Sequence, residues 1–503
     1  RFMLPDALYG RSSETEKIAE CFRAAAGGAR GLLLVAGPSG IGKTSLVYEL
    51  HKKTAAERKY FVSGKFNRDT MDVPFSALIA AFRELIIQIL TESNESIRAW
   101  QKRIFDALYP NIKIIIDVIP QLELITGPQP DIPEMGASES LNRFNLYFEK
   151  FVSIFPSAER PLVVFLDDLQ WADAASLAFL KTLARNDSPG HFLLIGSFRD
   201  NEMTEDHPLL SAISEIKSAG LRYDMLIPAP MDEHDIAAMI ADAFSLRGDR
   251  ANSLASLIKS KTGGNPFFVR EFLKKLYTED YIRFDDQWMW DTGVISQAEI
   301  TDNISSILIE SLSRLDAGLR ELLQVASCAG QRFDESVIAE ASTTGRERSD
   351  DLLSTAVAEG LIIKTGSGYK FAHDRIQETI YSTIRDGEKS RIHLRIAEIM
   401  LRAPEPEITD KVFQIAGHLN SARSDVEGEL RRRAAEINAR AGARARQAAA
   451  FDSVIPFYAS ALDFLSPDPW TGDYRLSLDL HTGLAESNYL TGRHGEGDRF
   501  FES

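Results

Sequence analysis

The stretch Gly37-Pro38-Ser39-Gly40-Ile41-Gly42-Lys43-Thr44 decides the fold of this chain, because it matches the pattern G-x-x-x-x-G-K-[ST] in suitable surroundings. The apolar run 32–36 before it predicts a buried parallel strand, and residues 45–50 after it predict a helix with one apolar face. Glycines let backbone N–H groups turn inward, and a helix N-terminus adds partial positive charge. A chance glycine-rich turn is the alternative, which the flanking strand and helix disfavour. The stretch therefore predicts a strand–loop–helix unit that cradles phosphate.

The last residues of this loop have distinct expected roles. Lys43 would reach the β- and γ-phosphates of a nucleotide, and the Thr44 hydroxyl would coordinate Mg²⁺. The nucleotide-binding segment then runs from Gly37 to Ser45, the first residue of the predicted helix.

The size and composition of the chain indicate a multi-domain globular protein. Its 503 residues suffice for roughly three or four domains, and 44% hydrophobic with 26% charged residues is an ordinary soluble composition. A net charge of −16 argues against a general nucleic-acid surface, and we expect no nucleic-acid partner. The basic exception lies on a predicted helix, where we expect a solvated face: Arg431, Arg432, Arg433, Arg440, Arg444 and Arg446.

The cysteine count argues against a disulfide-rich protein, and the hydropathy pattern argues against a membrane-spanning one. Cys21 and Cys328 lie on apolar stripes of predicted helices and are expected to fill the core, so no disulfide framework or cysteine metal cluster is expected. No run approaches about 18 apolar residues, and no signal peptide is visible. We expect a cytoplasmic protein without a membrane partner. Because the chain begins at Arg1 and stops within a helical pattern at Ser503, we expect it to be part of a longer protein.

A second landmark lies in the middle of the chain, where the apolar run 161–166 is followed by Asp167 and Asp168. Further strands are predicted at 60–66, 191–197 and 225–227. Strands that alternate with helices imply an α/β fold, a parallel sheet with helices on both faces. Ligands bind at the carboxyl ends of such strands, so Lys43, Asp167, Asp168 and Arg199 are expected to converge there.

The polar residues at these strand ends suit phosphoryl chemistry. Asp167 would hold Mg²⁺, and Asp168 would orient or deprotonate the attacking water. An ordinary Asp-Asp turn is the alternative, which the upstream phosphate loop disfavours. Arg199 could sense the γ-phosphate, since positive charge is needed where phosphate charge develops. A salt bridge from Arg199 to Asp200 or Glu202 competes with that interpretation.

The remaining chain predicts three helical regions after the sheet. Residues 1–227 are expected to form the nucleotide-binding domain, with a helical insertion at about 95–155. Prolines 228 and 230 mark a boundary, and 228–297 predict a helical lid. Helices and a small hairpin of strands 361–364 and 369–372 suggest a winged-helix domain at 298–387. Residues 388–503 show only amphipathic helices and suggest a truncated TPR-like array.

At this point the chain resembles the STAND ATPases, the signal-transduction ATPases with numerous domains, over nearly all of its length. Leu8-Tyr9-Gly10-Arg11 matches the hydrophobic-Gly-Arg motif that lies by the adenine in relatives, although the acid that usually follows the arginine is absent before Glu14. Gly264-Asn265-Pro266 is similar to the Gly-x-Pro element of the lid, whose proline packs on the base. Phe371-Ala372-His373-Asp374 is similar to the His-Asp element of the winged helix. The resemblance implies that His373 reaches the β-phosphate of ADP in a closed state. His373 could instead cap its own helix, and Pro266 could simply start one.

A narrower resemblance is to the ATPase segment of bacterial multi-domain Ser/Thr–histidine signalling kinases. It rests on Phe165-Leu166-Asp167-Asp168-Leu169-Gln170-Trp171-Ala172-Asp173 and on the segment 371–377. It implies kinase and sensor domains elsewhere in a larger chain as partners, while no kinase signature lies within these residues.

These resemblances imply a switch that is operated by ATP and ADP with Mg²⁺. The switch would hydrolyse ATP slowly, and it would be closed with ADP and open with ATP. A protein partner would bind the helical array. Two alternatives remain open. One is a scaffold or receptor module that binds nucleotide for stability and hardly hydrolyses it. The other is the ATPase part of a transcriptional regulator. An ATP-dependent homo-oligomer is also left open.

Overall fold

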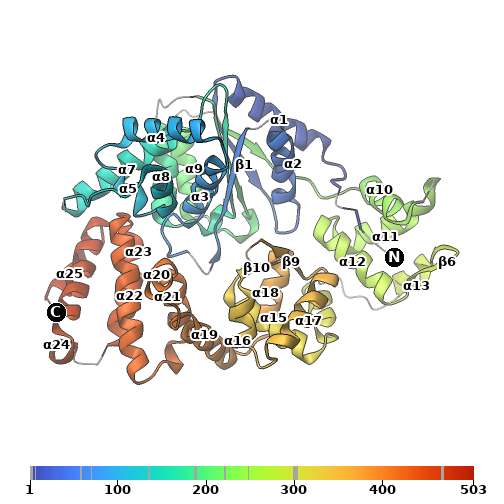
Figure 1. The fold of residues 1–503 in the computed structure, drawn as a ribbon. Coiled ribbons are helices and arrows are strands. Elements are labelled where there is room, and N and C mark those ends of the chain that lie inside the picture. Colours follow the sequence, from blue (N-terminus) through green and yellow to red (C-terminus); the bar gives the residue numbers. More distant parts are fainter. Residues whose placement is uncertain are drawn as a thin grey trace.

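A computed structural model describes residues 4–502 of the protein except 6, 57–58, 69–70, 134–135, 186–189, 220–222, 247, 298–303, 367 and 466–468. Figure 1 shows a sheet with its helices above, the helices of the C-terminal half below, and a small group of helices beside the junction. The carboxyl edge of the sheet faces the C-terminal half, so any ligand at that edge lies between the two halves.

The first half is built around a parallel five-stranded sheet in the order β2-β3-β4-β1-β5. Its strands are β1 (Arg30–Ala36), β2 (Tyr60–Lys65), β3 (Leu162–Asp167), β4 (Phe192–Phe198) and β5 (Tyr223–Leu226). Every residue of β3 and β4 is buried, as the continuous apolar runs predict for strands covered on both faces. The predicted parallel α/β sheet is confirmed.

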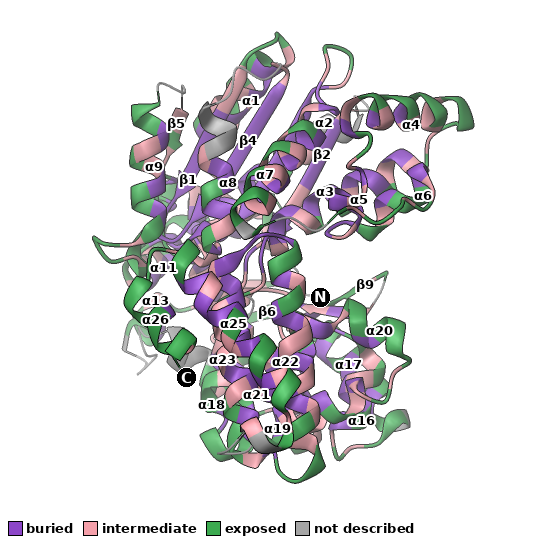
Figure 2. Cartoon of the chain, turned by 90° about the vertical axis from the view of Figure 1, so that its left-hand side faces the viewer, coloured by how far each residue is buried: buried purple, intermediate pink, exposed green. Residues whose placement is uncertain are grey.

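Two helix layers cover the sheet. One face packs against α1 (Ser12–Ala26) and α2 (Lys43–Ala56), and the other against α3 (Ser76–Leu90), α8 (Ala174–Arg185) and α9 (Pro208–Ser218). Side chains alternate between the two layers along each strand, so that Leu33 faces the first and Leu34 the second. Figure 2 shows the buried strands between helices whose outer sides are exposed. Asp173 precedes α8 and caps it, since its Oδ1 accepts from Ser176 N at 2.8 Å.

The predicted helical insertion consists of four helices beside the sheet: α4 (Asn94–Leu108), α5 (Lys113–Ile116), α6 (Glu123–Thr126) and α7 (Ala137–Ser153). It is anchored by stacked aromatic rings, among which Phe148 lies 4.5 Å from Phe179 of α8 between ring centroids. These contacts make the insertion part of the sheet's own core.

The small group beside the junction has a separate apolar core. It comprises α10 (Glu233–Phe244), α11 (Asn252–Thr262), α12 (Pro266–Thr278), β6 (Ile282–Asp285), β7 (Gln287–Trp290) and α13 (Thr292–Gln297). Trp288 and Trp290 pack against this core. Both tryptophans are thus structural.

Below the sheet lies a group of helices with a three-stranded antiparallel sheet in the order β8-β10-β9. Its elements are α14 (Ile304–Ser313), α15 (Ala317–Ala329), β8 (Arg332–Phe333), α16 (Glu335–Ala341), α17 (Arg346–Ala358), β9 (Ile362–Thr365), β10 (Gly368–Phe371) and α18 (Asp374–Thr383). The predicted hairpin is present, but the two-residue strand β8 was not predicted. Residue 298, the predicted domain boundary, and Ser367 of the predicted turn lie outside the described residues.

The last part is wholly helical among the described residues. It contains α19 (Asp386–Met400), α20 (Glu405–Asp410), α21 (Val412–Ser421), α22 (Glu429–Gln447), α23 (Phe451–Phe464), α24 (Pro469–Gly472), α25 (Tyr474–Leu490) and α26 (His494–Glu502). Four of the six arginines of α22 form ion pairs, for example Arg432 with Asp473 at 3.3 Å and Arg433 with Glu405 at 3.5 Å, whereas Arg431 and Arg444 donate to backbone carbonyl oxygens. The predicted fold class, a P-loop sheet followed by helical regions, is confirmed.

The two cysteines differ in burial. Cys328 is buried as predicted, but Cys21 is only half-buried and its Sγ lies 3.5 Å from Asp224 Oδ2. Among the described residues, no helix has the length and apolar character that a membrane span requires.

Candidate nucleotide-binding site

The phosphate loop joins β1 to α2 and keeps its backbone open toward a ligand. Gly40 and Gly42 have φ of +81° and +98°, a left-handed region that favours glycine. Lys43 is the first residue of α2, and its Nζ donates to Gly37 O at 2.7 Å and to Pro38 O at 3.1 Å. Burial lowers the pKa of Lys43. A buried cation with only carbonyl partners, at a helix N-terminus, suits a phosphate group.

The proposed metal ligands lie side by side. Thr44 Oγ1 donates to Asp167 Oδ2 at 2.9 Å, and Ser197 Oγ donates to Asp167 Oδ1. Burial raises the pKa of Asp167. A hydroxyl and a carboxylate oxygen at one point are hard oxygen ligands of the kind Mg²⁺ takes when nucleotide oxygens and waters complete its shell. The residues present therefore fit a magnesium ion.

Asp168 is held beside this pair by an unusual backbone conformation. Its φ of +58° lies in the left-handed region, which aspartate tolerates better than most residues. Its backbone N donates to Ser197 Oγ at 3.2 Å, and its Oδ1 accepts from Gln170 Nε2 at 2.9 Å. The two carboxylates thus leave the end of β3 in different directions.

Arg199 is almost fully buried and is surrounded by carboxylates. Its Nε lies 3.2 Å from Asp168 Oδ1, and its Nη1 lies 2.9 Å from Glu202 Oε1, the predicted competing ion pair. Two further partners come from α18, Glu378 at 2.9 Å and Asp374 at 3.2 Å. The guanidinium carbon of Arg199 also lies 4.5 Å from the centroid of the Trp171 ring. Arg199 therefore joins the sheet edge to α18.

Lys65, the last residue of β2, is a site residue that the sequence did not reveal. Its Nζ lies 3.1 Å from Asp168 Oδ2 and 3.8 Å from Asp167 Oδ2, and it donates to Asp374 Oδ2. Burial alone would lower the pKa of Lys65, but the three carboxylates outweigh it and raise that pKa. The only sequence signal was a lysine at a strand end, because its contact with β3 depends on the register that pairs Lys65 with Asp167.

The start of α12 lies against the phosphate loop. Asn265 caps the helix through Oδ1, which accepts from Phe267 N at 3.2 Å, and its Nδ2 donates to Ser39 O at 3.0 Å. Phe267 N also lies 3.2 Å from Gly40 O. Pro266 is the first residue of the helix and lines the same cavity, so the helix-starting role is present without excluding a contact with a base.

His373 lies where α12, in the small group beside the junction, contacts the C-terminal half. Its ring stacks on Phe267 with centroids 4.1 Å apart and planes at 21°. Its Nδ1 accepts from Arg375 N at 3.1 Å, so His373 does cap α18. Burial lowers the pKa of His373 to about 4, so the ring is neutral near pH 7 and its proton lies on Nε2. Nε2 therefore remains as a donor, and the cap and the phosphate contact are compatible.

Gly10 and Arg11 connect the N-terminal segment to both the loop and the lid. Arg11 pairs with Glu14 at 2.8 Å and donates to Ile41 O at 3.2 Å. Glu14 thus supplies the acid that is missing directly after the arginine. A Cβ at Gly10 would lie 2.1 Å from Asp235 Oδ2, so only glycine fits against the start of α10.

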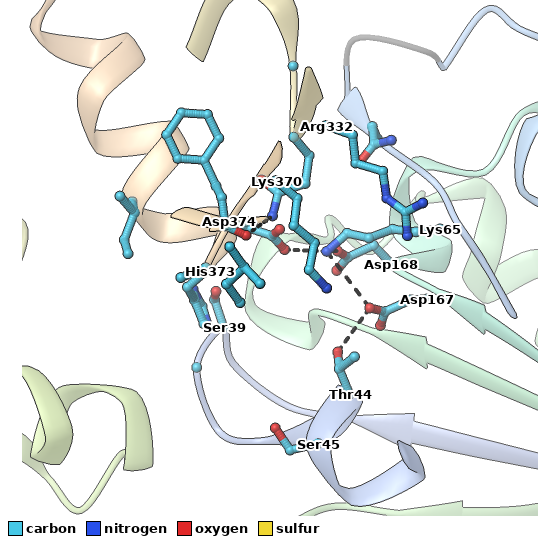
Figure 3. A pocket seen from close by; sticks show the side chains of 18 of the residues that line it. Ser39, Thr44, Ser45, Lys65, Asp167, Asp168, Arg332, Lys370, His373 and Asp374 are labelled. Atoms are coloured by element: carbon cyan, nitrogen blue, oxygen red, sulfur yellow. Dashed lines mark hydrogen bonds and ion pairs between the residues drawn. The ribbon is translucent and has the colours of Figure 1, made fainter. Parts of the chain in front are cut away.

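These elements enclose a cavity of about 1530 Å³ between the sheet edge, the lid and the C-terminal half. Figure 3 shows Thr44, Asp167, Asp168, Lys65, Asp374 and His373 around it. The predicted site residues that line it are Arg11, Ser39, Gly40, Ile41, Gly42, Lys43, Thr44, Ser45, Asp167, Asp168, Arg199, Pro266 and His373. Gly10, Gly37 and Pro38 are not among the residues that line the cavity. The cavity is larger than the roughly 300–1,000 Å³ of common ligand pockets.

Residues 7–195 match the AAA ATPase domain family. This matched region contains the phosphate loop, Lys65 and both carboxylates of β3. This match confirms the predicted similarity to P-loop ATPases of the AAA type over these residues.

The proteins to which the chain is similar include a histidine kinase and an uncharacterised protein. The chain is 25% identical to the hybrid signal transduction histidine kinase G of Dictyostelium discoideum, over 99% of this chain and 18% of that protein. It is 23% identical to an uncharacterised protein of Rhizobium meliloti, over 77% of this chain and 36% of that protein. The chain therefore spans well under half of the length of either relative.

A similar solved structure is the STAND protein with a tetratricopeptide repeat sensor from Pyrococcus horikoshii. It is 14% identical, the match covers 100% of this chain and 64% of that one, and the TM-score is 0.47.

Replacing the buried cation of the loop tests the site. We expect Lys43→Ala to reduce the affinity for Mg·ATP by at least about a hundredfold, because phosphate would lose its charge-assisted partner. Titration with a fluorescent ATP analogue measures this, and Lys102→Ala on exposed α4 is the control. Equal affinity of Lys43→Ala and the parent chain would remove the assignment.

The burial of His373 predicts a pH dependence of nucleotide retention. Its pKa falls from 6.5 to about 4 when the site is closed, so protonation opposes closing as the pH drops below 6.5. We expect ADP to dissociate about tenfold faster at about pH 5.5 than at about pH 7.5.

His373→Asn keeps a helix cap but cannot titrate, and it should lose most of that acceleration. Stopped-flow release of labelled ADP gives both rates. An unchanged pH profile in this variant would show that His373 does not control closing.

Proposed function

We propose that this chain is an ATP-operated switch that hydrolyses ATP slowly and is closed with ADP and open with ATP. The ATPase-type domain supports nucleotide chemistry. The observation that carries the proposal is the docking of α18 on the catalytic edge of the sheet, where Asp374 and Glu378 reach Lys65 and Arg199. A ligand that binds at that edge acts directly on the contact between the two halves.

The side chains of the closed site divide the work of phosphoryl transfer. The phosphate loop and Lys43 bind the phosphate tail, and Thr44 with Asp167 would hold Mg²⁺, which supplies charge neutralisation when bound. Asp168 is the acceptor that would orient an attacking water. In the closed arrangement, however, Asp168 already accepts from Arg199 and pairs with Lys65. These contacts would keep the carboxylate from serving as a base, which supports the proposed slow turnover.

Closing also restrains Arg199. Two of the four carboxylates around its guanidinium come from α18, so departure of α18 would leave only Asp168 and Glu202. Arg199 would then be available to a terminal phosphate. A nucleotide can shift the equilibrium only by its differential affinity for the two states. An additional phosphate competes for Arg199 and repels Asp374, so ATP should favour the open state more than ADP does.

The helices α19–α26 are proposed to carry the signal. They continue directly from α18, so a protein partner on this array could pull α18 away or hold it in place. Kinase and sensor domains of a larger chain are the proposed recipients, consistent with the names of the signalling relatives. Lack of coupling between such a partner and nucleotide exchange would favour the scaffold alternative.

Weakening the α18 contact should release ADP. Asp374→Asn removes the carboxylate that Lys65 and Arg199 share, and we expect ADP to dissociate at least about tenfold faster, with a larger effect when Glu378→Gln is added. Asp386→Asn, at an exposed position of the same half, is the control. If ADP release is as slow in the double variant as in the parent chain, α18 does not hold the closed state.

The role of Asp168 is tested by turnover. Asp168→Asn should retain ATP binding and lose about a hundredfold in phosphate release, because an amide cannot accept the proton of the attacking water. Asp200→Asn, at an exposed position beside the site, should turn over normally. Parent-like phosphate release by Asp168→Asn would assign the base to another residue.

A further inference from the structure

The C-terminal wall of the cavity carries two cations whose placement the switch does not explain. Lys370 on β10 lies directly opposite Arg332 on β8 in the antiparallel register. Like charges directly opposite in a ladder are destabilising. Both side chains line the same cavity as Lys43 and Thr44. Figure 3 shows both beside Lys65, on the side of the cavity away from the phosphate loop.

These cations differ from their neighbours in having no anionic partner. Lys65 and Arg199 are each surrounded by three or four carboxylates. Among the residues that the structure describes, neither Lys370 nor Arg332 forms an ion pair. Burial, then Arg332 and Lys65, lower the pKa of Lys370. Lys370 is half-buried and Arg332 is exposed, so it is the ammonium group of Lys370 that is partly desolvated without an anion, at a cost that a bound anion would offset.

Chain geometry keeps this ammonium group close to the contacts that define the closed state. Lys370 precedes His373 by three residues and Asp374 by four, and β10 leads directly into α18. Any movement of α18 away from the sheet would therefore carry Lys370 away from the phosphate loop. The same movement would carry away Asp374, whose negative charge alone would repel phosphate.

We propose that Lys370, supported by Arg332, binds the phosphate tail of the nucleotide from the side opposite to Lys43. This inference rests on the proposed nucleotide site and adds to it a second ligand from the C-terminal half, beside His373. The phosphate group would then be a bridge, with Lys43 on one half and Lys370 on the other. Lys370 would offset the repulsion from Asp374 and make tight ADP binding depend on closing.

Affinity measurements with the whole 503-residue chain test this proposal. Titrations with fluorescent ADP compare the parent chain with Lys370→Gln and Arg332→Gln, with Arg402→Gln, an exposed cation of the same half outside the cavity, as the control. We expect Lys370→Gln to weaken ADP binding by about ten- to a hundredfold and Arg332→Gln by less, the range for a lost charge-assisted hydrogen bond. Adenosine, which lacks phosphate, should bind the parent and Lys370→Gln equally.

Further variants distinguish a phosphate contact of Lys370 from an effect on folding, and test the inference separately from the nucleotide site. Lys370→Arg keeps the charge and should restore most of the ADP affinity, which a purely structural role of Lys370 would not predict. ADP binding that is abolished by Lys43→Ala but is parent-like in Lys370→Gln would overturn this inference and leave the nucleotide site standing. Absence of ADP binding in the parent chain would overturn both.

A further titration tests whether Lys370 binds the phosphate of the nucleotide or free inorganic phosphate. Titration of inorganic phosphate into the ADP-loaded chain should show no binding that depends on Lys370. Such binding, together with unchanged ADP affinity in Lys370→Gln, would indicate a separate anion site and contradict the bridging role.

Discussion

The rest of the structure depends on the pairing of buried charges where the sheet ends. Asp167 and Asp168 leave the same strand and would repel each other in a dry site, and Arg199 cannot lose its proton. Buried charges persist only when they are paired, and removing one partner of a buried pair is strongly destabilising. Lys65 and Arg199 compensate the two aspartates, and Asp374 of α18 completes the cluster. The catalytic edge is therefore electrostatically complete only when the two halves are together.

The charge cluster lies where three parts of the chain meet. The lid touches the phosphate loop through α12, and Phe267 of the lid stacks on His373 of the C-terminal half. Three parts of the chain thus meet over one cavity that is larger than common ligand pockets. In the proposed switch, a nucleotide in that cavity would exchange contacts within the charge cluster, and the number of its phosphates would decide whether α18 stays docked. Local changes at such a junction can be amplified because packed interfaces tend to have discrete arrangements.

Sequence reasoning predicted the site residues that lie in short local motifs and missed those whose contacts depend on strand pairing. The phosphate loop and the β3 aspartates were predictable because each function is encoded in a short pattern beside a strand. Lys65 was not, since its role follows from the parallel register with β3, and parallel partners are far apart in sequence. Asp374 was visible only as part of a motif, and its contacts with the sheet required the packing of two halves. The strand β8 was too short, at two residues, for an alternating pattern.

The account is tested most directly by amide hydrogen exchange of α18 and β10 with bound ADP and with a non-hydrolysable ATP analogue. If the charge cluster holds the halves together with ADP and is released by ATP, these segments and the end of β2 should exchange slowly with ADP and much faster with the analogue. The strands β1 and β4 at the centre of the sheet should be protected equally in both. The same slow exchange of α18 and β10 with either nucleotide would contradict the claim that phosphate controls their docking.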